Sequence, residues 1–317
     1  MWEFEGLFDA EIDPDDQTML SQFWRDEKTG IKLGRMGYRR RTTKAGNRIE
    51  AEVYPVFGRG DRMKARAAKK NITPEAQQKL NTERSARHLI QLIEANFSEK
   101  DLAMGLNYQG TPPDDDRVRK DLRNFLNKVK RLREKKGLPD LKYIYAIGGD
   151  EMPSPGYSGK RPHVHLILSG GLDREELETI WKKTAGAGAT NCDRLQPNDD
   201  GLEGIARYLM KQRFDRPEKK NAKKWSRSRN LKAPWKSSCR TSDCKISNGR
   251  VKRIAFDFLN HAKETMERLY PGYDLRQCRI NYSDVVDGVY IRCILRKRRA
   301  GSRSEEKRRR TDEQKIL

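Results

Sequence analysis

The segment Arg161-Pro-His163-Val-His165-Leu-Ile-Leu168 is an apolar run that contains two of the chain's 4 histidines. Successive side chains of a β-strand point to opposite faces, so His163 and His165 share one face while aliphatic side chains form the other. Neutral imidazole is the commonest metal ligand, and two imidazoles on one strand need an oxygen donor nearby to hold a divalent ion with open positions. The alternative is a solvent-facing histidine pair on a half-exposed strand.

Strands and helices alternate around this segment, as the spacing of their apolar residues predicts. The acidic run 114–116 favours a helix start, and Asp173 with Glu176 forms a capping pair for a second helix. A helix from Thr73 to about Asn96 precedes them. The expected order is then strand 102–108, helix 114–132, strand 141–147, strand 163–168, helix 173–181, strand 189–195 and helix 201–212.

This β-α-β-β-α-β order, followed by one more helix, predicts an α+β fold with a ferredoxin-like, split βαβ core. Such a core is an antiparallel sheet with its helices on one face. The aliphatic face of the histidine strand would meet the helices. The histidines would lie on the open face, where a metal ion and DNA would bind.

Further segments flank this core. A β-ribbon is expected from 34–38 and 49–54, joined by a basic turn at 39–46, and a helix at 253–269 precedes a strand pair at 276–282 and 289–295. We divide the chain into an N-terminal extension with the ribbon (1–72), the core (73–215), a basic linker (216–250), a small α/β unit (251–297) and a basic tail (298–317) expected to be disordered.

The sequence contains 68 Lys and Arg residues but only 46 Asp and Glu residues, which gives a formal net charge of +22. This excess of positive charge favours a polyanion as the partner. No run approaches the ~20 apolar residues of a transmembrane helix, and the acidic start does not resemble a signal peptide, so we expect a cytoplasmic protein with no membrane partner. The 5 scattered cysteines fit a reducing compartment. Cys239 and Cys244, with Cys278, Cys293 or His261, leave zinc binding as an alternative, although no Cys-x-x-Cys occurs.

The helix expected at 201–212 places Tyr208 and Lys211 on neighbouring positions of one face, because residues three apart adjoin on a helix surface. Gly204 lies on the same side. Glycine is a poor helix former, which suggests that something approaches the helix closely there. The alternative is that Tyr208 is an aromatic residue at the core boundary and Lys211 is a solvated charge.

The histidine strand followed by a helix with Tyr208-Leu-Met-Lys211 resembles the HUH endonuclease superfamily, and within it the single-tyrosine rolling-circle replication initiators of phages, prophages and plasmids. The resemblance covers roughly residues 100 to 232. It includes Ser228-Arg-Asn-Leu-Lys232, which is similar to a basic segment after the tyrosine helix in such proteins. The resemblance implies nicking and joining of single-stranded DNA at a replication origin. A host helicase and polymerase would be further partners, because no Gly-x-x-x-x-Gly-Lys-Ser/Thr motif for a fused helicase occurs.

The resemblance also implies roles for individual residues. His163 and His165 would bind Mg²⁺ or Mn²⁺, and Tyr208 would attack the scissile phosphate to give a 5′-phosphotyrosine. Lys211 would assist the phenol or hold the phosphate. A third, acidic metal ligand would follow the preceding strand, as Glu151 or, next in order of preference, Asp150.

Basic and aromatic residues alternate after the tyrosine helix. Cations can follow the phosphates of a single strand while aromatic faces stack on its bases, so we expect DNA binding here. A solvated linker is the alternative. The expected DNA-binding residues are Lys219, Lys220, Lys223, Lys224, Trp225, Arg227, Arg229 and Lys232, and Trp235 follows them.

Two other classes remain open. A transposase or relaxase of the same superfamily would share the site chemistry, and the Ser-Arg-Asn-Leu-Lys segment favours an initiator over either. A non-catalytic nucleic-acid-binding protein with a ferredoxin-like sheet would present aromatic residues on its open face, whereas this strand presents imidazoles.

Overall fold

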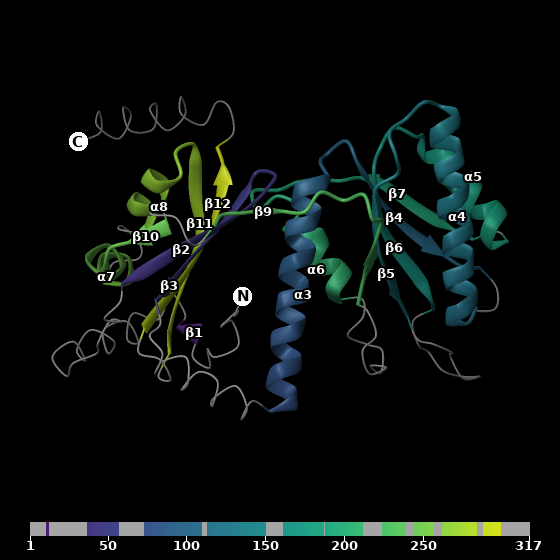
Figure 1. The fold of residues 1–317 in the computed structure, drawn as a ribbon. Coiled ribbons are helices and arrows are strands. Elements are labelled where there is room, and N and C mark those ends of the chain that lie inside the picture. Colours follow the sequence, from purple (N-terminus) through teal and green to yellow (C-terminus); the bar gives the residue numbers. More distant parts are fainter. Residues whose placement is uncertain are drawn as a thin grey trace, which may run out of the picture. The chain divides into compact units, whose positions relative to one another are not determined.

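The computed structural model describes residues 11–12, 37–56, 73–109, 113–149, 161–186, 188–211, 224–238, 244–256, 262–283 and 288–298. Within these residues the fold is α+β, with antiparallel sheets and 6 helices (Figure 1). The contacts divide the chain into two units, 83–234 and 1–82 together with 235–317. None of the helices in the described ranges combines the length and the hydrophobicity needed to traverse a bilayer.

A five-stranded sheet forms the centre of the unit 83–234. Its strand order is β7-β4-β6-β5-β8, and every neighbouring pair is antiparallel. The strands are β4 (Leu102–Asn107), β5 (Tyr143–Gly148), β6 (His163–Leu168), β7 (Thr190–Arg194) and β8 (Ser226–Arg227). Strand β8 lies in the segment expected to be a linker, yet it pairs with β5 and so completes this sheet.

Helices α4 (Asp115–Lys135) and α5 (Arg174–Ala185) cover the aliphatic face of the histidine strand. The Asp114 side chain caps α4 by accepting a hydrogen bond from the Arg117 N–H, and Asp173 and Glu176 form the expected capping box of α5. Buried residues recur along α4 at helical spacing and meet the sheet. They are Val118, Leu122, Phe125, Leu126 and Val129 from α4, with Val164, Leu166 and Leu168 from β6.

The expectation of helices on one face only is wrong. Helices α3 (Pro74–Asn96) and α6 (Glu203–Lys211) pack on the opposite face, against Ile144 and Ile167 (Figure 1). The cause is that β6 is apolar on both faces at its C-terminal end, so Ile167 needs its own cover. The histidines lie toward the other end of β6, where both side chains are only partly buried.

Trp181 on α5 anchors this unit. Its side chain is fully buried, its ring meets Tyr108 and Phe125 edge to face, and its Nε1–H donates a hydrogen bond to the Asn107 carbonyl at 3.0 Å. Asn107 is the register partner of His163, so this bond fixes the strand beside the histidine pair.

We expect Trp181→Phe to lower the free energy of unfolding by about 1–3 kcal/mol, because it removes the hydrogen bond and leaves a cavity. Urea denaturation followed by circular dichroism measures the change. Exposed Lys182→Gln on the same helix is the control and should leave the midpoint unchanged. An unaltered midpoint in Trp181→Phe would contradict the anchoring role.

The second unit contains a sheet in the order β1-β11-β12-β3-β2-β10, with β9 also paired to β2. Helices α7 (Asn248–Phe256) and α8 (Lys263–Leu269) pack on it. The strands are β1 (Glu11–Ile12), β2 (Tyr38–Ala45), β3 (Arg48–Pro55), β9 (Trp235–Lys236), β10 (Lys245–Ile246), β11 (Tyr273–Ser283) and β12 (Gly288–Lys297). The N-terminal ribbon and the C-terminal strand pair, expected as separate parts, share this sheet through β3 and β12.

The ribbon also differs from its prediction. Residues 39–45, expected in a turn, belong to strand β2, and the turn is only Gly46 and Asn47. The arginines fit a strand because partners on the next strand offset their charge, as when Arg41 pairs with Glu52. The helix expected at 253–269 is represented by two helices, α7 and α8.

Candidate functional site

His163 and His165 lie on β6 as the alternation predicts. Both are partly buried, and their ring centroids are 4.8 Å apart with the ring planes at 84°. The rigid strand, paired on both sides by β4 and β5, holds the two imidazoles in this arrangement. The pair therefore has the preorganisation that a metal site needs.

A backbone carbonyl selects the tautomer of the neutral His163 ring. Its Nδ1 lies 2.7 Å from the Arg161 carbonyl oxygen, which can only accept a hydrogen bond. In the neutral ring, Nδ1 therefore carries the proton and Nε2 keeps a lone pair. A backbone carbonyl bound to the second ring nitrogen is the arrangement typical of metal-binding histidines. The donor set thus fits a divalent ion.

Small residues on the adjoining strands make room for the rings. Gly148 is the register partner of His163 on β5, and a Cβ atom placed there would lie 2.6 Å from His163 Nε2. Ala146 and Gly105 flank His165 on β5 and β4. A larger residue at position 148 would displace the His163 ring from its position.

Tyr208 on α6 lies next to this pair. Its ring centroid is 4.8 Å from that of His165, at 79°, and its side chain is 48% exposed. Buried Ala206, Leu209 and Met210 attach α6 to the sheet. The Glu94 carboxylate accepts a hydrogen bond from the Leu202 N–H at the start of this segment. The structure thus brings together the two imidazoles and the phenol that the sequence analysis selected.

Other nucleophilic side chains of this unit are less suited to attack. Tyr108 is buried among α4 and α5, and burial, with a contribution from Asp121, raises the pKa of its phenol. Burial also raises the pKa of the Cys192 thiol to about 11. Both therefore stay protonated at neutral pH.

Lys211 is exposed at the end of α6, three residues after Tyr208. Gly204 is exposed as well, and a Cβ atom placed there would meet no described atom within 4 Å. The close approach expected at Gly204 is therefore not found among the described residues.

Asp150, Glu151, Lys219, Lys220 and Lys223 lie outside the described residues. In the described ranges, no three His, Cys, Asp or Glu side chains are grouped as a metal site.

Two asparagines on the histidine face were not singled out from the sequence. Asn107 on β4 pairs with His163, and Asn191 on β7 pairs with Gly105, the partner of His165. Both are exposed. The alternation of β4 around Gly105 could have placed Asn107 there, whereas Asn191 required knowledge that β7 adjoins β4. Their amides can donate and accept hydrogen bonds beside the imidazoles.

The described part of the basic segment is attached to this unit. Trp225 donates a hydrogen bond from Nε1 to Ser85 Oγ at 2.9 Å, and its ring lies 5.8 Å from that of His88 on α3. The Lys232 backbone N–H and carbonyl both bond to the Asn96 side chain. Trp225 thus has a packing role, while the side chains of Arg227, Arg229 and Lys232 remain exposed and Lys224 is partly buried.

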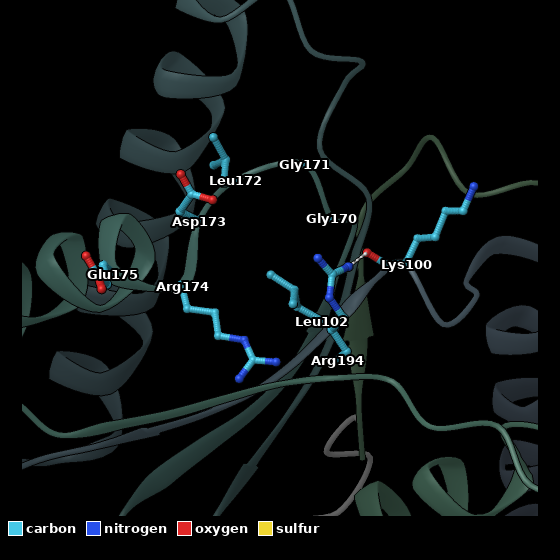
Figure 2. A pocket seen from close by; sticks show the side chains of 9 residues that line it. All are labelled: Lys100, Leu102, Gly170, Gly171, Leu172, Asp173, Arg174, Glu175 and Arg194. Carbon is cyan, nitrogen blue, oxygen red and sulfur yellow. Dashed lines mark hydrogen bonds between the residues drawn. The ribbon is translucent and has the colours of Figure 1, made fainter.

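A cavity of about 420 Å³ opens at the opposite end of the sheet, where β4 begins and β7 ends (Figure 2). Its lining combines Arg174 and Arg194 with Asp173 and Glu175. Arg174 is already paired with Asp193, and Arg194 donates a hydrogen bond to the Lys100 carbonyl. This cavity adds no group to the histidine site, from which the length of the strands separates it.

Comparison of the chain with family models, with curated proteins and with solved structures finds no match. The chemistry of the site must therefore be inferred from its residues. Two imidazoles can hold a divalent ion, which polarises a phosphoryl oxygen, and an adjacent phenol can act as a nucleophile. Together they suit the cleavage of a phosphodiester.

Proposed function

We propose that this chain is a rolling-circle replication initiator of the HUH type, which nicks and joins single-stranded DNA at a replication origin. The observation that carries the proposal is the 4.8 Å separation between the Tyr208 and His165 rings, with His163 beside them. A nucleophile, two metal-binding nitrogens and an exposed surface occur at one end of one sheet.

In this proposal the Tyr208 Oη attacks the phosphorus of the scissile phosphodiester. The bond from phosphorus to the 3′ oxygen breaks, the phenol loses its proton, and the leaving oxygen takes up a proton to become a free 3′-hydroxyl. The 5′ end stays attached to Tyr208, so the bond energy is conserved and the same site can later rejoin ends. The free hydroxyl would prime synthesis by a host polymerase.

His163 and His165, with Glu151 or Asp150, would hold Mg²⁺ or Mn²⁺ at this site. When bound, the ion supplies Lewis-acid stabilisation of the charge that develops on the phosphoryl oxygens. The Arg161 carbonyl orients His163 for this role. Lys211 lies about one helical turn from Tyr208, where it would assist the phenol or hold the phosphate.

The strand order supports the finer fold proposal. Strands β4, β5, β6 and β7, with α4 and α5 between them, follow the chain order of a split βαβ unit, and in space they lie in the order β7-β4-β6-β5. We propose this ferredoxin-like core, with α3, α6 and β8 added to it. The excess of basic residues and the choice of DNA as the partner are consistent with action in the cytoplasm, where a host helicase would unwind the origin.

The decisive experiment captures the covalent intermediate without knowledge of the origin sequence. The full chain is incubated with a randomised single-stranded DNA library and Mn²⁺, then denatured, and protein that carries DNA is isolated and its DNA sequenced. We expect a covalent adduct with a recurring sequence next to the cleavage point, and none after chelation of the metal. A library that yields no adduct in the presence of Mn²⁺ or Mg²⁺ would rule out the proposal. Rejoining of ends without transposition products would favour an initiator over a transposase.

Trp235 provides a further prediction. In the described part of the chain, Tyr208 and Trp235 are the two large hydrophobic residues that remain exposed, Trp235 to 60%. Exposed Lys44 pairs with Trp235 across the strands and exposed Lys236 follows it. We expect Trp235→Ala to weaken binding of single-stranded DNA by about 10-fold, because one base–aromatic stacking contact is lost. Fluorescence anisotropy with a labelled oligonucleotide measures this. Lys236→Gln, which keeps the indole, should have a smaller effect, and equal affinity of Trp235→Ala and wild type would contradict the stacking role.

A further inference from the structure

Helix α4 carries a row of basic side chains on its outer face. This row, which we call the α4 crest, consists of Lys120, Arg123, Lys130, Arg131 and Lys135, all exposed. At 100° per residue Lys120, Arg123 and Arg131 lie on the side of the helix opposite its buried residues, and Lys130 and Lys135 lie at the two edges of that side. The crest extends for roughly 22 Å at 1.5 Å per residue.

The cations at the flanks of α4 differ from those of the crest because they have partners within this unit. Arg117 bonds to Asp121, Arg119 lies 4.0 Å from Asp115, Lys128 donates to Thr184, and Lys136 pairs with Glu176.

The crest cations form no ion pair with described residues, and the one further contact shown is that of the Lys130 ammonium, 5.8 Å from the centre of the Tyr143 ring. Asp116 and Glu134 lie near the two ends of the crest, so the excess of positive charge is greatest between them.

Like charges three and four residues apart destabilise a helix, and the crest contains such pairs in Lys120 with Arg123 and Arg131 with Lys135. Opposite charges lie beside the crest only toward its ends, where Asp116 precedes Lys120 and Glu134 follows Arg131, and the exposed residues from 123 to 131 include no acidic side chain. The arrangement is accounted for if a polyanion neutralises the crest.

We propose that the α4 crest binds the phosphate backbone of double-stranded DNA, on the face of the sheet opposite the proposed nicking site. Single-stranded DNA is bound by cations interleaved with aromatic faces, whereas the exposed side chains of α4 from 123 to 131 are Lys, Arg and Asn, which contact phosphates. A rigid helix that presents cations along about four turns can contact successive phosphates of a duplex. The choice of DNA as the polyanion rests on the proposed function.

The crest and the Tyr208 site lie on opposite faces of the sheet. Helix α4 packs on the aliphatic face of β6, while α6 with Tyr208 packs on the histidine face (Figure 1). A duplex on the crest would therefore leave the histidine face accessible to a single strand. The two binding activities can be tested separately.

The test uses the full chain with Tyr208→Phe, so that no substrate is cut, and a labelled duplex of 20 base pairs. We expect Arg123→Gln/Arg131→Gln to raise the Kd for this duplex by about 10-fold near 0.1 M salt. The slope of log K against log salt concentration should fall by about 2, because two phosphate contacts are lost. Circular dichroism verifies that the helix is intact.

The matched control is Arg253→Gln/Lys263→Gln, which removes the same charge from exposed positions on α7 and α8. A control that lowers duplex affinity as much as the crest variant would overturn the proposal in favour of a general effect of net charge, as would a crest variant with the affinity and salt slope of wild type.

The proposed function is tested by a separate measurement. If it is wrong, the chain that keeps Tyr208 forms no covalent adduct with DNA. Loss of duplex binding in the crest variant would still be measured in that case. If both proposals hold, the crest variant with Tyr208 intact should form the adduct with a short single strand at the wild-type rate.

Discussion

Tyr208→Phe should form no covalent adduct with single-stranded DNA at any concentration of Mn²⁺ or Mg²⁺. The substitution removes one oxygen atom from an exposed ring that lies against His165, so it deletes the nucleophile and keeps the packing. We expect the loss to exceed roughly 10³-fold, because an enzyme that forms a covalent intermediate has no alternative route without its nucleophile. A denaturing gel of the protein with labelled DNA measures the adduct directly.

The control measurement for this variant is its affinity for single-stranded DNA. Tyr208→Phe keeps the histidines, the cations and the aromatic ring, so its affinity for single-stranded DNA should stay within about 2-fold of wild type. Lys211→Gln should slow adduct formation without abolishing it, since Lys211 acts on the phenol or the phosphate from a neighbouring turn. A Tyr208→Phe protein that still forms adduct would assign the chemistry to another residue.

Gly148→Ala should weaken binding of the divalent ion and slow nicking by about 10–100-fold, the range seen when the support of a metal-binding histidine is disturbed. The added methyl group would lie 2.6 Å from His163 Nε2, the nitrogen that keeps its lone pair, and would force the ring out of position. Titration with Mn²⁺, followed by calorimetry or by the rate of adduct formation, measures the change. High Mn²⁺ should partly restore the rate, because weaker binding can be offset by mass action.

Gly105→Ala is the matched control. Gly105 is the register partner of His165 on β4, but among the described atoms a Cβ placed there would approach only Asn191 Cβ, at an ordinary contact distance of 4.0 Å. Its metal affinity should match that of wild type. If Gly148→Ala also binds Mn²⁺ normally, His163 does not serve as the ligand that its geometry indicates.

The alternation of β6 and the helical spacing of α4 were enough to predict which face of the sheet forms the main core. The local pattern is sufficient for these two elements because the aliphatic face of the strand and the apolar face of the helix pack directly on each other. They failed at Ile144 and Ile167, since an apolar residue does not identify the helix that will cover it. The partner helices α3 and α6 are separated from these strands in sequence.

The candidate site was predictable in part for similar reasons. His163 and His165 are alternate residues of one strand, so their position on the same face follows from local structure alone. The approach of Tyr208 depends on how α6 attaches to the sheet, and Asn191 depends on the pairing of β7 with β4. In the ribbon, the arginines of β2 were assigned to a turn because their cross-strand partners, such as Glu52, lie outside the local window.

The pairing of β3 with β12 has a consequence for the order in which the chain folds during synthesis. The N-terminal hairpin must wait until residues 288–297, which form β12, have left the ribosome before the free edge of β3 is paired. Until then that edge is open to association with other nascent chains. The segment from 83 to 234 contains all the strands of its own sheet and can be completed earlier.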